Sequence, residues 1–302
     1  MQNKILNHYL QLGPFTNPGC YKEKLINNLP NDIKSIGLLV RKQTIHRVVL
    51  AAGNTGSNTN LKYGDMKKIP WYRQAEDDNF PTAAAMLAEL YRRDNRGFVI
   101  DREEKNRLVV TCRFVSILMA SILKSKRIPC RVRSGFASYF RNPNGKARNT
   151  GGQATDHWIN EYWDKRQKSW VMIDVDGSIE DYLTFDSYDI PKNVFEFSAD
   201  SWLSIRQRNV KPEHFHDTAG YEGLVTTGWE LFHDFHCLMN NEIIYQHGPK
   251  YVWNRMNKLT KAELKEIDHL ASLMKNPDDN FDELIKIWET KKKFRILKGA
   301  LL

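Results

Sequence analysis

The sequence predicts an α+β fold, and three features of the chain lead to this expectation. Apolar residues recur at helical spacing through most of residues 1–104, and they do so again through residues 191–302. Between these segments, in residues 105–190, an apolar helix is followed by short runs that alternate as β-strands do. This order of elements is typical of α+β proteins. We therefore expect a core at 105–190, a helical N-terminal region packed on it, a mostly helical C-terminal region, and one compact unit.

The composition is that of a folded protein. The chain has 302 residues, of which 41% are hydrophobic and 11% aromatic, and this is enough to bury a large core. The formal net charge is +9, but the 45 basic residues are spread among 36 acidic ones. The densest basic run, "KKKFRILK" from Lys291 to Lys298, is typical of the solvated C-terminal end of a helix. No zinc-finger or RNA-binding signature occurs, so nucleic acid stays a minor alternative as a partner.

The cysteines indicate a reducing compartment. They are far apart, form no C-x-x-C motif and are too few to frame a chain of this length: Cys20, Cys112, Cys130 and Cys237. The N-terminus lacks the continuous apolar segment of a signal peptide. The longest nearly apolar stretch, Phe114–Leu123, is too short to span a bilayer. We expect a cytoplasmic protein with no membrane partner.

The helices on either side of the core carry recognisable start signals. In the N-terminal region, Asn31 or Asp32 precedes an apolar-periodic run, and Pro81 and Thr82 stand at the head of another. In the C-terminal region, "LTKAEL" contains a capping box, Thr260 with Glu263. A further helix is expected to start near Asp278 or Asp279.

The core combines a buried helix with strands. A helix from Cys112 ends at "RIPC", because proline disfavours a helical residue before it. "CRVRSGFASYF" alternates as a strand, and a polar, glycine-rich loop follows from Arg141 to Asp156. "HWINEYW" and "WVMIDVD" then form a hairpin, joined by six polar residues from Asp164 to Ser169. The loop is a candidate flap or a plain surface loop.

Cys112 stands where a cysteine can be reactive. Backbone N–H groups in the first turn of a helix are unpaired, and the helix macrodipole is positive there. Both effects favour a thiolate, which is the nucleophilic form of cysteine, and so lower the pKa of a thiol. Arg113 adds positive charge nearby. Free cysteines are more often small buried hydrophobes, and this alternative stays open for Cys112 taken alone.

The hairpin supplies a base and an orienting acid. If Trp163 pairs with Trp170, His157 shares a face with Asp174 and Asp176, and Asp174 is diagonal to His157. A carboxylate there would fix the tautomer of the imidazole and stabilise the imidazolium. Strand parity does not separate Asp174 from Asp176. The alternative is that His157 caps a strand and Asp174 is a turn acid.

The remaining histidines do not form a recognised metal site. His214 and His216, with His233 and His236, have spacings that only loosely resemble metal-binding patterns. We favour structural roles for all four. No D-x-D-x-D-G calcium loop occurs either, and we expect neither a metal nor an organic cofactor.

The order Cys, His, Asp, with a helix followed by a hairpin, is one of the papain-like layouts. "CRFVSILMASILKSKRIPCRVRSGF" resembles the nucleophile helix and following strand of the transglutaminase-like superfamily, and "HWINEYWDKRQKSWVMIDVD" resembles its His and Asp strands. The core resemblance covers residues 105–176, and "FTNPGCYKEKLINNLP" and "GFASYF" resemble a bacterial branch. It implies a papain-like fold and a triad of Cys112, His157 and Asp174. The tryptophan four residues before the acid, Trp170, selects Asp174 over Asp176.

Two positions depart from the family pattern. Thr111 stands before the cysteine where glycine is usual, and Trp158 follows His157 directly, whereas many members place the tryptophan one residue later. The second departure argues against a role of Trp158 in substrate or oxyanion contacts.

The resemblance implies cysteine-dependent amide chemistry through a thioester, on a peptide or protein substrate. We expect hydrolysis, peptidase-like or deamidase-like, because the loop that leads to His157 is polar and flexible and would admit water. The alternatives are an amine-transferring transglutaminase and a non-catalytic scaffold that keeps the cleft to bind a protein.

Overall fold

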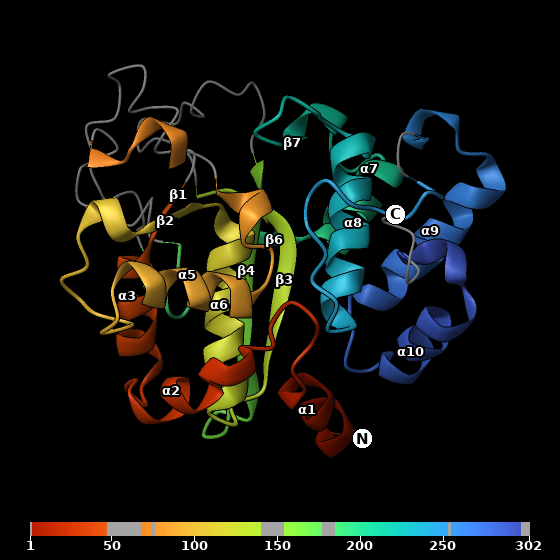
Figure 1. The fold of residues 1–302 in the computed structure, drawn as a ribbon. Helices are drawn as coiled ribbons and strands as arrows, with labels where there is room; N and C mark the ends of the chain where they lie inside the picture. The colour runs from red at the N-terminus through yellow and green to blue at the C-terminus, as the bar shows by residue number, and fades with distance from the viewer. Residues whose placement is uncertain are drawn as a thin grey trace. The chain divides into compact units, whose positions relative to one another are not determined.

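The computed structural model describes residues 2–46, 68–73, 76–139, 154–176, 185–252 and 255–296. The chain forms two compact units, and each is assembled from separated stretches of sequence (Figure 1). The first, here called the Cys112 unit, comprises residues 9–131 and 159–190. The second, here called the His157 unit, comprises residues 1–8, 132–158 and 191–302. The elements define a mixed α+β protein, as the sequence predicts.

The Cys112 unit is built around one buried helix, α6. Every residue of α6 (Cys112–Ser125) is buried, and three helices pack on it: α2 (Lys22–Asn27), α3 (Ile33–Gln43) and α5 (Ala83–Arg93). Strands β1 (Thr44–His46) and β2 (Leu108–Val110) pair in parallel just before α6 begins. Ile45, Ile69 and Val109 form the apolar cluster on this pair.

Most strands belong to one sheet with mainly antiparallel pairing. Hydrogen bonds join the strands in the order β5-β4-β3-β6, and β7 pairs with β4 in parallel. Their bounds are Cys130–Ala137 for β3, Ala154–Asp164 for β4, Ser169–Ile173 for β5, Phe195–Phe197 for β6 and Phe215–His216 for β7. Because β3 and β4 each run from one unit into the other, the chain crosses between the units inside these strands.

Helices make up most of the His157 unit. Helix α7 packs on both α8 and α9, and α10 packs on α9. The bounds are Gln2–Leu10 for α1, Ser198–Arg206 for α7, Leu224–Leu238 for α8, Lys261–Met274 for α9 and Phe281–Thr290 for α10.

Short 3-10 turns occur in both units. In the Cys112 unit they occupy Gly19–Tyr21, Trp71–Arg73, Asp77–Asn79 and Glu104–Asn106. In the His157 unit they occupy Pro212–His214, Met256–Lys258 and Lys292–Phe294.

Several start signals act as the sequence predicts. Asp32 caps α3 by accepting a hydrogen bond from the Ser35 N–H, and Thr82 caps α5 in the same way. The capping box of Thr260 and Glu263 is present at the start of α9. The structure confirms these predictions. They can be made from the sequence because a capping side chain bonds to the backbone of its own helical turn.

Three boundaries differ from the prediction. Helix α3 ends at Gln43, and the apolar run continues as β1, because Thr44–His46 pairs with β2. Helix α10 begins at Phe281, after Asp278 and Asp279, and ends at Thr290, and a 3-10 turn follows it at Lys292–Phe294. The strands of the hairpin extend to Asp164 and Ser169, which leaves a shorter turn than the sequence suggests.

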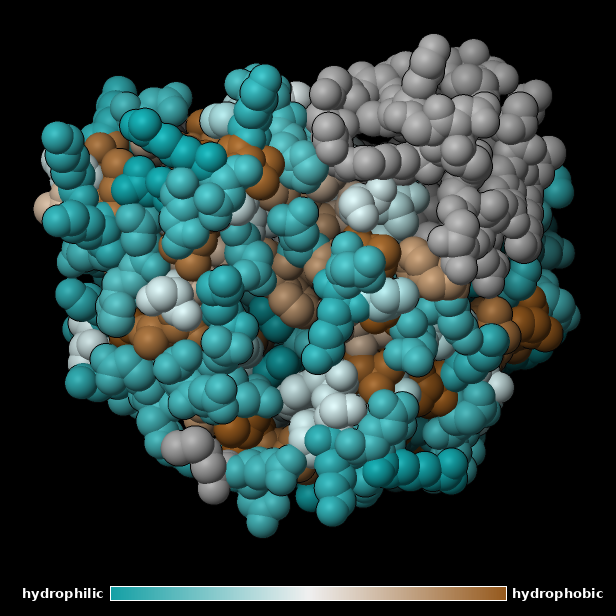
Figure 2. Space-filling model, turned by 180° about the vertical axis from the view of Figure 1, so that it is seen from behind, coloured by the Kyte–Doolittle hydropathy of each residue, from teal (hydrophilic) through white to brown (hydrophobic). Residues whose placement is uncertain are grey.

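The surface is mixed in character. On the face drawn in Figure 2, the described residues are mostly hydrophilic, and hydrophobic side chains form small separate groups among them. Scattered apolar groups of this kind are normal on a folded protein. Among the described residues, no helix combines the length and apolarity that a bilayer crossing requires.

Candidate active site

Cys112 is the first residue of α6, as the sequence predicts. Thr111 precedes it in an extended conformation, with φ −90° and ψ 177°, and its carbonyl oxygen accepts the N–H groups of Phe114 and Val115. The Cys112 side chain is buried, with 6% of the residue exposed. The first turn of a helix is a position where unpaired backbone N–H groups and the helix dipole in general favour an anionic side chain.

Asp77 holds the turn that precedes Cys112. Its Oδ1 atom accepts hydrogen bonds from the Thr111 N–H at 2.8 Å and from the Thr111 hydroxyl at 3.0 Å. Asp77 is itself buried, with 3% exposed. One carboxylate thus binds both the N–H and the hydroxyl of Thr111. Thr111 stands where glycine is usual in the family that the sequence resembles. Sequence reasoning missed Asp77, because no local pattern links it to a residue 34 positions away.

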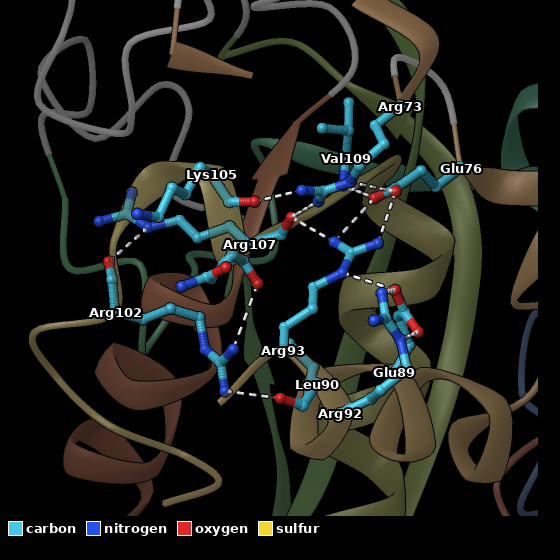
Figure 3. A network of polar contacts seen from close by, with 11 residues as sticks. Arg73, Glu76, Glu89, Leu90, Arg92, Arg93, Arg102, Lys105, Arg107 and Val109 are labelled. Carbon is cyan, nitrogen blue, oxygen red and sulfur yellow. Dashed lines mark hydrogen bonds and ion pairs between the residues drawn. The ribbon is translucent and has the colours of Figure 1, made fainter. Parts of the chain in front are cut away.

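Glu76 fixes the strand that leads into this turn. It accepts the N–H of Val109 at 3.0 Å through Oε2, and its own N–H donates to the Val109 carbonyl at 2.9 Å. Its carboxylate also meets the guanidinium groups of Arg73 and Arg93, at 3.0 Å and 2.6 Å (Figure 3). Both arginines donate to the Arg107 carbonyl as well. This network ties β2 to α5, so the backbone just before Cys112 is held by charge-assisted bonds.

Arg113 is a structural cation. It is fully buried, donates to the Pro81 carbonyl at the head of α5, and places its guanidinium over the rings of Phe15 and Phe114, 5.0 Å and 4.7 Å from the centroids. The positive charge expected next to the cysteine is therefore shared with two aromatic faces.

His157 lies on β4 and is buried, with 2% exposed. Its ring meets that of Tyr139 edge-on, with 6.2 Å between centroids. Trp158 is fully buried and packs against the rings of His233 and Tyr245, at 5.7 Å and 5.6 Å. Trp158 is thus a core residue of the His157 unit.

Asn160 binds strand β4 to helix α6 inside the Cys112 unit. Its side-chain amide donates to the Ser116 carbonyl at 3.0 Å and approaches the Cys130 sulfur at 3.7 Å. Asn160 follows His157 by three residues along the strand, and Ser116 follows Cys112 by four along the helix. Because Asn160 is fully buried, this polar contact has no competition from water.

The hairpin has the predicted register. Trp163 pairs with Trp170, and the ladder continues to Asn160 opposite Ile173, where β5 ends. Asp174 follows immediately and is buried, with 2% exposed. Its N–H donates to the Ser187 carbonyl at 2.7 Å, so the chain leaves the ladder at this residue.

The two candidate acids have different surroundings in the Cys112 unit. The Oδ1 atom of Asp174 accepts the backbone N–H of Asp176 at 2.9 Å. The Oδ2 atom of Asp176 lies 3.1 Å from Nε2 of His46. Sequence reasoning did not single out His46. The structure thus brings Cys112, Asp174 and Asp176 into one unit, and His157 lies on the part of β4 that belongs to the other.

The other histidines have structural surroundings. His236 donates from Nδ1 to the Phe232 carbonyl at 2.7 Å, and its Nε2 accepts the Ile296 N–H at 3.1 Å, so it is held neutral. Burial lowers its pKa to about 3. Burial also lowers the pKa of His216. Within the described ranges, no three His, Cys, Asp or Glu side chains gather as metal ligands.

The candidate flap falls largely outside the described residues, since positions 140–153 are among those that the structure leaves undescribed. No protein-family model matches the chain. No curated protein and no solved structure matches it either. The functional interpretation therefore depends on the sequence motifs and on the local geometry given above.

Proposed function

We propose that the chain is a cysteine hydrolase of transglutaminase-like type, which acts on amide bonds of a peptide or protein through a thioester. The observation that carries this proposal is the placement of Cys112 at the first position of a buried helix. The preceding turn is held by Asp77 and the preceding strand by Glu76. These two contacts restrain the backbone just before Cys112, which is what a precisely placed nucleophile requires.

The proposed mechanism assigns one role to each residue of the triad. His157 takes the proton of Cys112, or forms an ion pair with it, and the thiolate attacks the carbonyl carbon. The backbone N–H of Cys112 stabilises the oxyanion, an effect of about 3 kcal/mol per donor in proteases where it has been measured. His157 then protonates the leaving amine. Water attacks the resulting thioester and releases the acid, which restores the thiolate.

Asp174 is proposed as the residue that orients His157. One observation supports Asp174 over Asp176: the carboxylate of Asp176 lies beside a different histidine, His46. The pairing of Trp163 with Trp170 agrees with the expected register, but it does not separate the two acids. A buried carboxylate on the imidazole would hold the tautomer that can accept the thiol proton.

The hydrogen bond from Asn160 to Ser116 supports the pairing of this strand with this helix in catalysis. A nucleophile and its base must keep hydrogen-bond reach through the reaction. A buried polar contact between β4 and α6 restrains sliding of the strand along the helix. Such restraint is what a site assembled from two elements requires.

The proposal is tested with a small activated aryl ester and a panel of peptide amides, with and without a primary amine. We expect an acyl adduct on Cys112 by intact-mass analysis, free acid as the main product, and no adduct in Cys112→Ser. Cys20→Ser is the matched control, because Cys20 is exposed and should not affect turnover. Dominant amine incorporation would indicate a transglutaminase instead. No adduct and no product would favour the non-catalytic scaffold.

A further inference from the structure

A second imidazole–carboxylate pair lies in the Cys112 unit. Nε2 of His46 is 3.1 Å from Oδ2 of Asp176, and both side chains are largely buried, with 11% and 7% exposed. At this distance the two side chains are in polar contact, and each limits the movement of the other. The triad described above does not use this pair.

The pair is close to the nucleophile in the fold. His46 ends β1 and pairs in parallel register with Val110, the last residue of β2. Cys112 follows Val110 by two residues, and Thr111 between them is extended. Side chains two apart on an extended backbone share a face, so the Cα atoms of His46 and Cys112 are expected about 8 Å apart on one face.

The pair is also connected to Asp174. The backbone N–H of Asp176, the partner of His46, donates to Oδ1 of Asp174 at 2.9 Å. Between these acids, the Val175 carbonyl accepts Nε of Arg41 from α3 at 3.3 Å. Two residues of the α3–β1 segment therefore hold residues 174–176. Arg41 binds the Val175 carbonyl, and His46 contacts the Asp176 carboxylate.

We propose that His46 is a positioning residue for Asp174. It holds the Asp176 side chain, and with it the Asp176 N–H, so that one oxygen of the Asp174 carboxylate is fixed by a backbone bond. His46 itself neither contacts substrate nor exchanges a proton in the reaction. The inference rests on the proposed function, because it assigns to Asp174 the task of orienting the catalytic base.

The contact with Asp176 is made by one atom of the His46 ring, Nε2. The amide nitrogen of glutamine reaches about as far as Nε2 of histidine, so His46→Gln keeps a polar group toward Asp176, whereas His46→Leu removes it. His214→Leu is the matched control. His214 also lies near a carboxylate, with Nε2 3.7 Å from Oε1 of Glu196, but it belongs to the other unit.

The first measurement is steady-state kinetics with the acyl donor. We expect His46→Leu to lower kcat by about 10- to 100-fold, the usual effect of losing an outer-shell partner, with KM nearly unchanged. We expect His46→Gln to retain most of kcat and His214→Leu to match the wild type. In an Asp174→Asn background, His46→Leu should have little further effect, because it acts through Asp174. Multiplying effects of the two changes would overturn the positioning role.

The second measurement does not depend on turnover. The Asp176 amide proton reports its hydrogen bond to Asp174, and we follow its NMR chemical shift in the full chain. We expect an upfield shift in His46→Leu and the wild-type position in His46→Gln. An unchanged Asp176 amide in His46→Leu would overturn the inference even if the enzyme is active. A shifted amide in a protein without turnover would leave the positioning contact standing and reject the proposed function instead.

Discussion

The side-chain amide of Asn160, on β4, donates to the main-chain oxygen of Ser116, on α6, at 3.0 Å. The contact joins the strand that carries His157 to the helix that Cys112 begins. The contact lies three residues past the histidine on the strand and one helical turn past the cysteine on the helix. We therefore expect its loss to affect the proposed chemistry.

Replacing Asn160 with leucine is expected to reduce both stability and activity. The change removes the side-chain donor that binds the buried Ser116 carbonyl. We therefore expect a loss of about 1–3 kcal/mol in the free energy of unfolding. The measurement is urea unfolding together with the alkylation rate of Cys112. Asn280→Leu is the control, since Asn280 also donates to a backbone carbonyl, that of Leu273, but in the His157 unit. Equal alkylation rates in the two variants would contradict the link to the site.

Asp77→Ala should impair the proposed activity more than it destabilises the fold. Thr111 would lose the acceptor for both its N–H and its hydroxyl, and the backbone before Cys112 would be free to shift. We expect a fall in kcat of about 10-fold or more, and Asp77→Asn should recover part of it, because its side-chain oxygen still accepts one bond. Asp32→Ala removes a helix cap elsewhere in the same unit and should cost about 1 kcal/mol of stability with no effect on kcat. Similar kcat losses in both alanine variants would rule out a specific role for Asp77.

Stability should fall as the solution is acidified, in part through His236. Burial lowers the pKa of His236 in the folded protein to about 3, whereas in the unfolded chain it stays near its ordinary value of about 6.5. Between these values the unfolded state binds a proton that the folded state does not, so stability is lost as pH falls below about 6.5. From pH 7 to pH 5 this one group is expected to cost about 2 kcal/mol. Urea unfolding at both pH values, for the wild type and His236→Gln, measures the difference. The same pH slope in both proteins would refute the assignment.

Asp174→Asn and Asp176→Asn should differ in their effects. The first change removes the carboxylate proposed to orient His157, and we expect kcat to fall by several orders of magnitude, since a misoriented base fails even when the geometry is otherwise intact. The second change keeps an oxygen or an amide toward His46 and keeps the Asp176 N–H, so a smaller loss is expected. If only the second substitution abolishes turnover, Asp176 is the orienting acid.

Local signals in the sequence were sufficient to predict the elements that carry the site. The start of α6 at Cys112 and the pairing of Trp163 with Trp170 both follow from residues within one helix or one hairpin. Capping and hairpin register are decided over a few residues, and the sequence displays those residues side by side.

The supporting contacts could not be predicted in the same way. Strand β1 pairs in parallel with β2, and parallel strands are joined by long connections that leave no turn signal in the sequence. The placement of His46 opposite Val110 therefore emerges only in the folded chain. The same is true of Glu76 and Asp77, which reach β2 and Thr111 from a separate segment. Such long-range polar contacts are selected by tertiary packing, which single-sequence patterns do not record.

The most direct test of the account compares two cysteines of the same molecule. Cys20 is exposed and Cys112 is buried, so accessibility alone would make Cys20 the faster to react with iodoacetamide. We label the full chain at about pH 6, where an ordinary thiol is almost entirely protonated, and follow both sites by peptide mass spectrometry. The account predicts that Cys112 reacts faster than Cys20 and that His157→Gln abolishes this advantage. Faster labelling of Cys20, with Cys112 unreactive in the native protein, would contradict the proposal that Cys112 is an activated nucleophile.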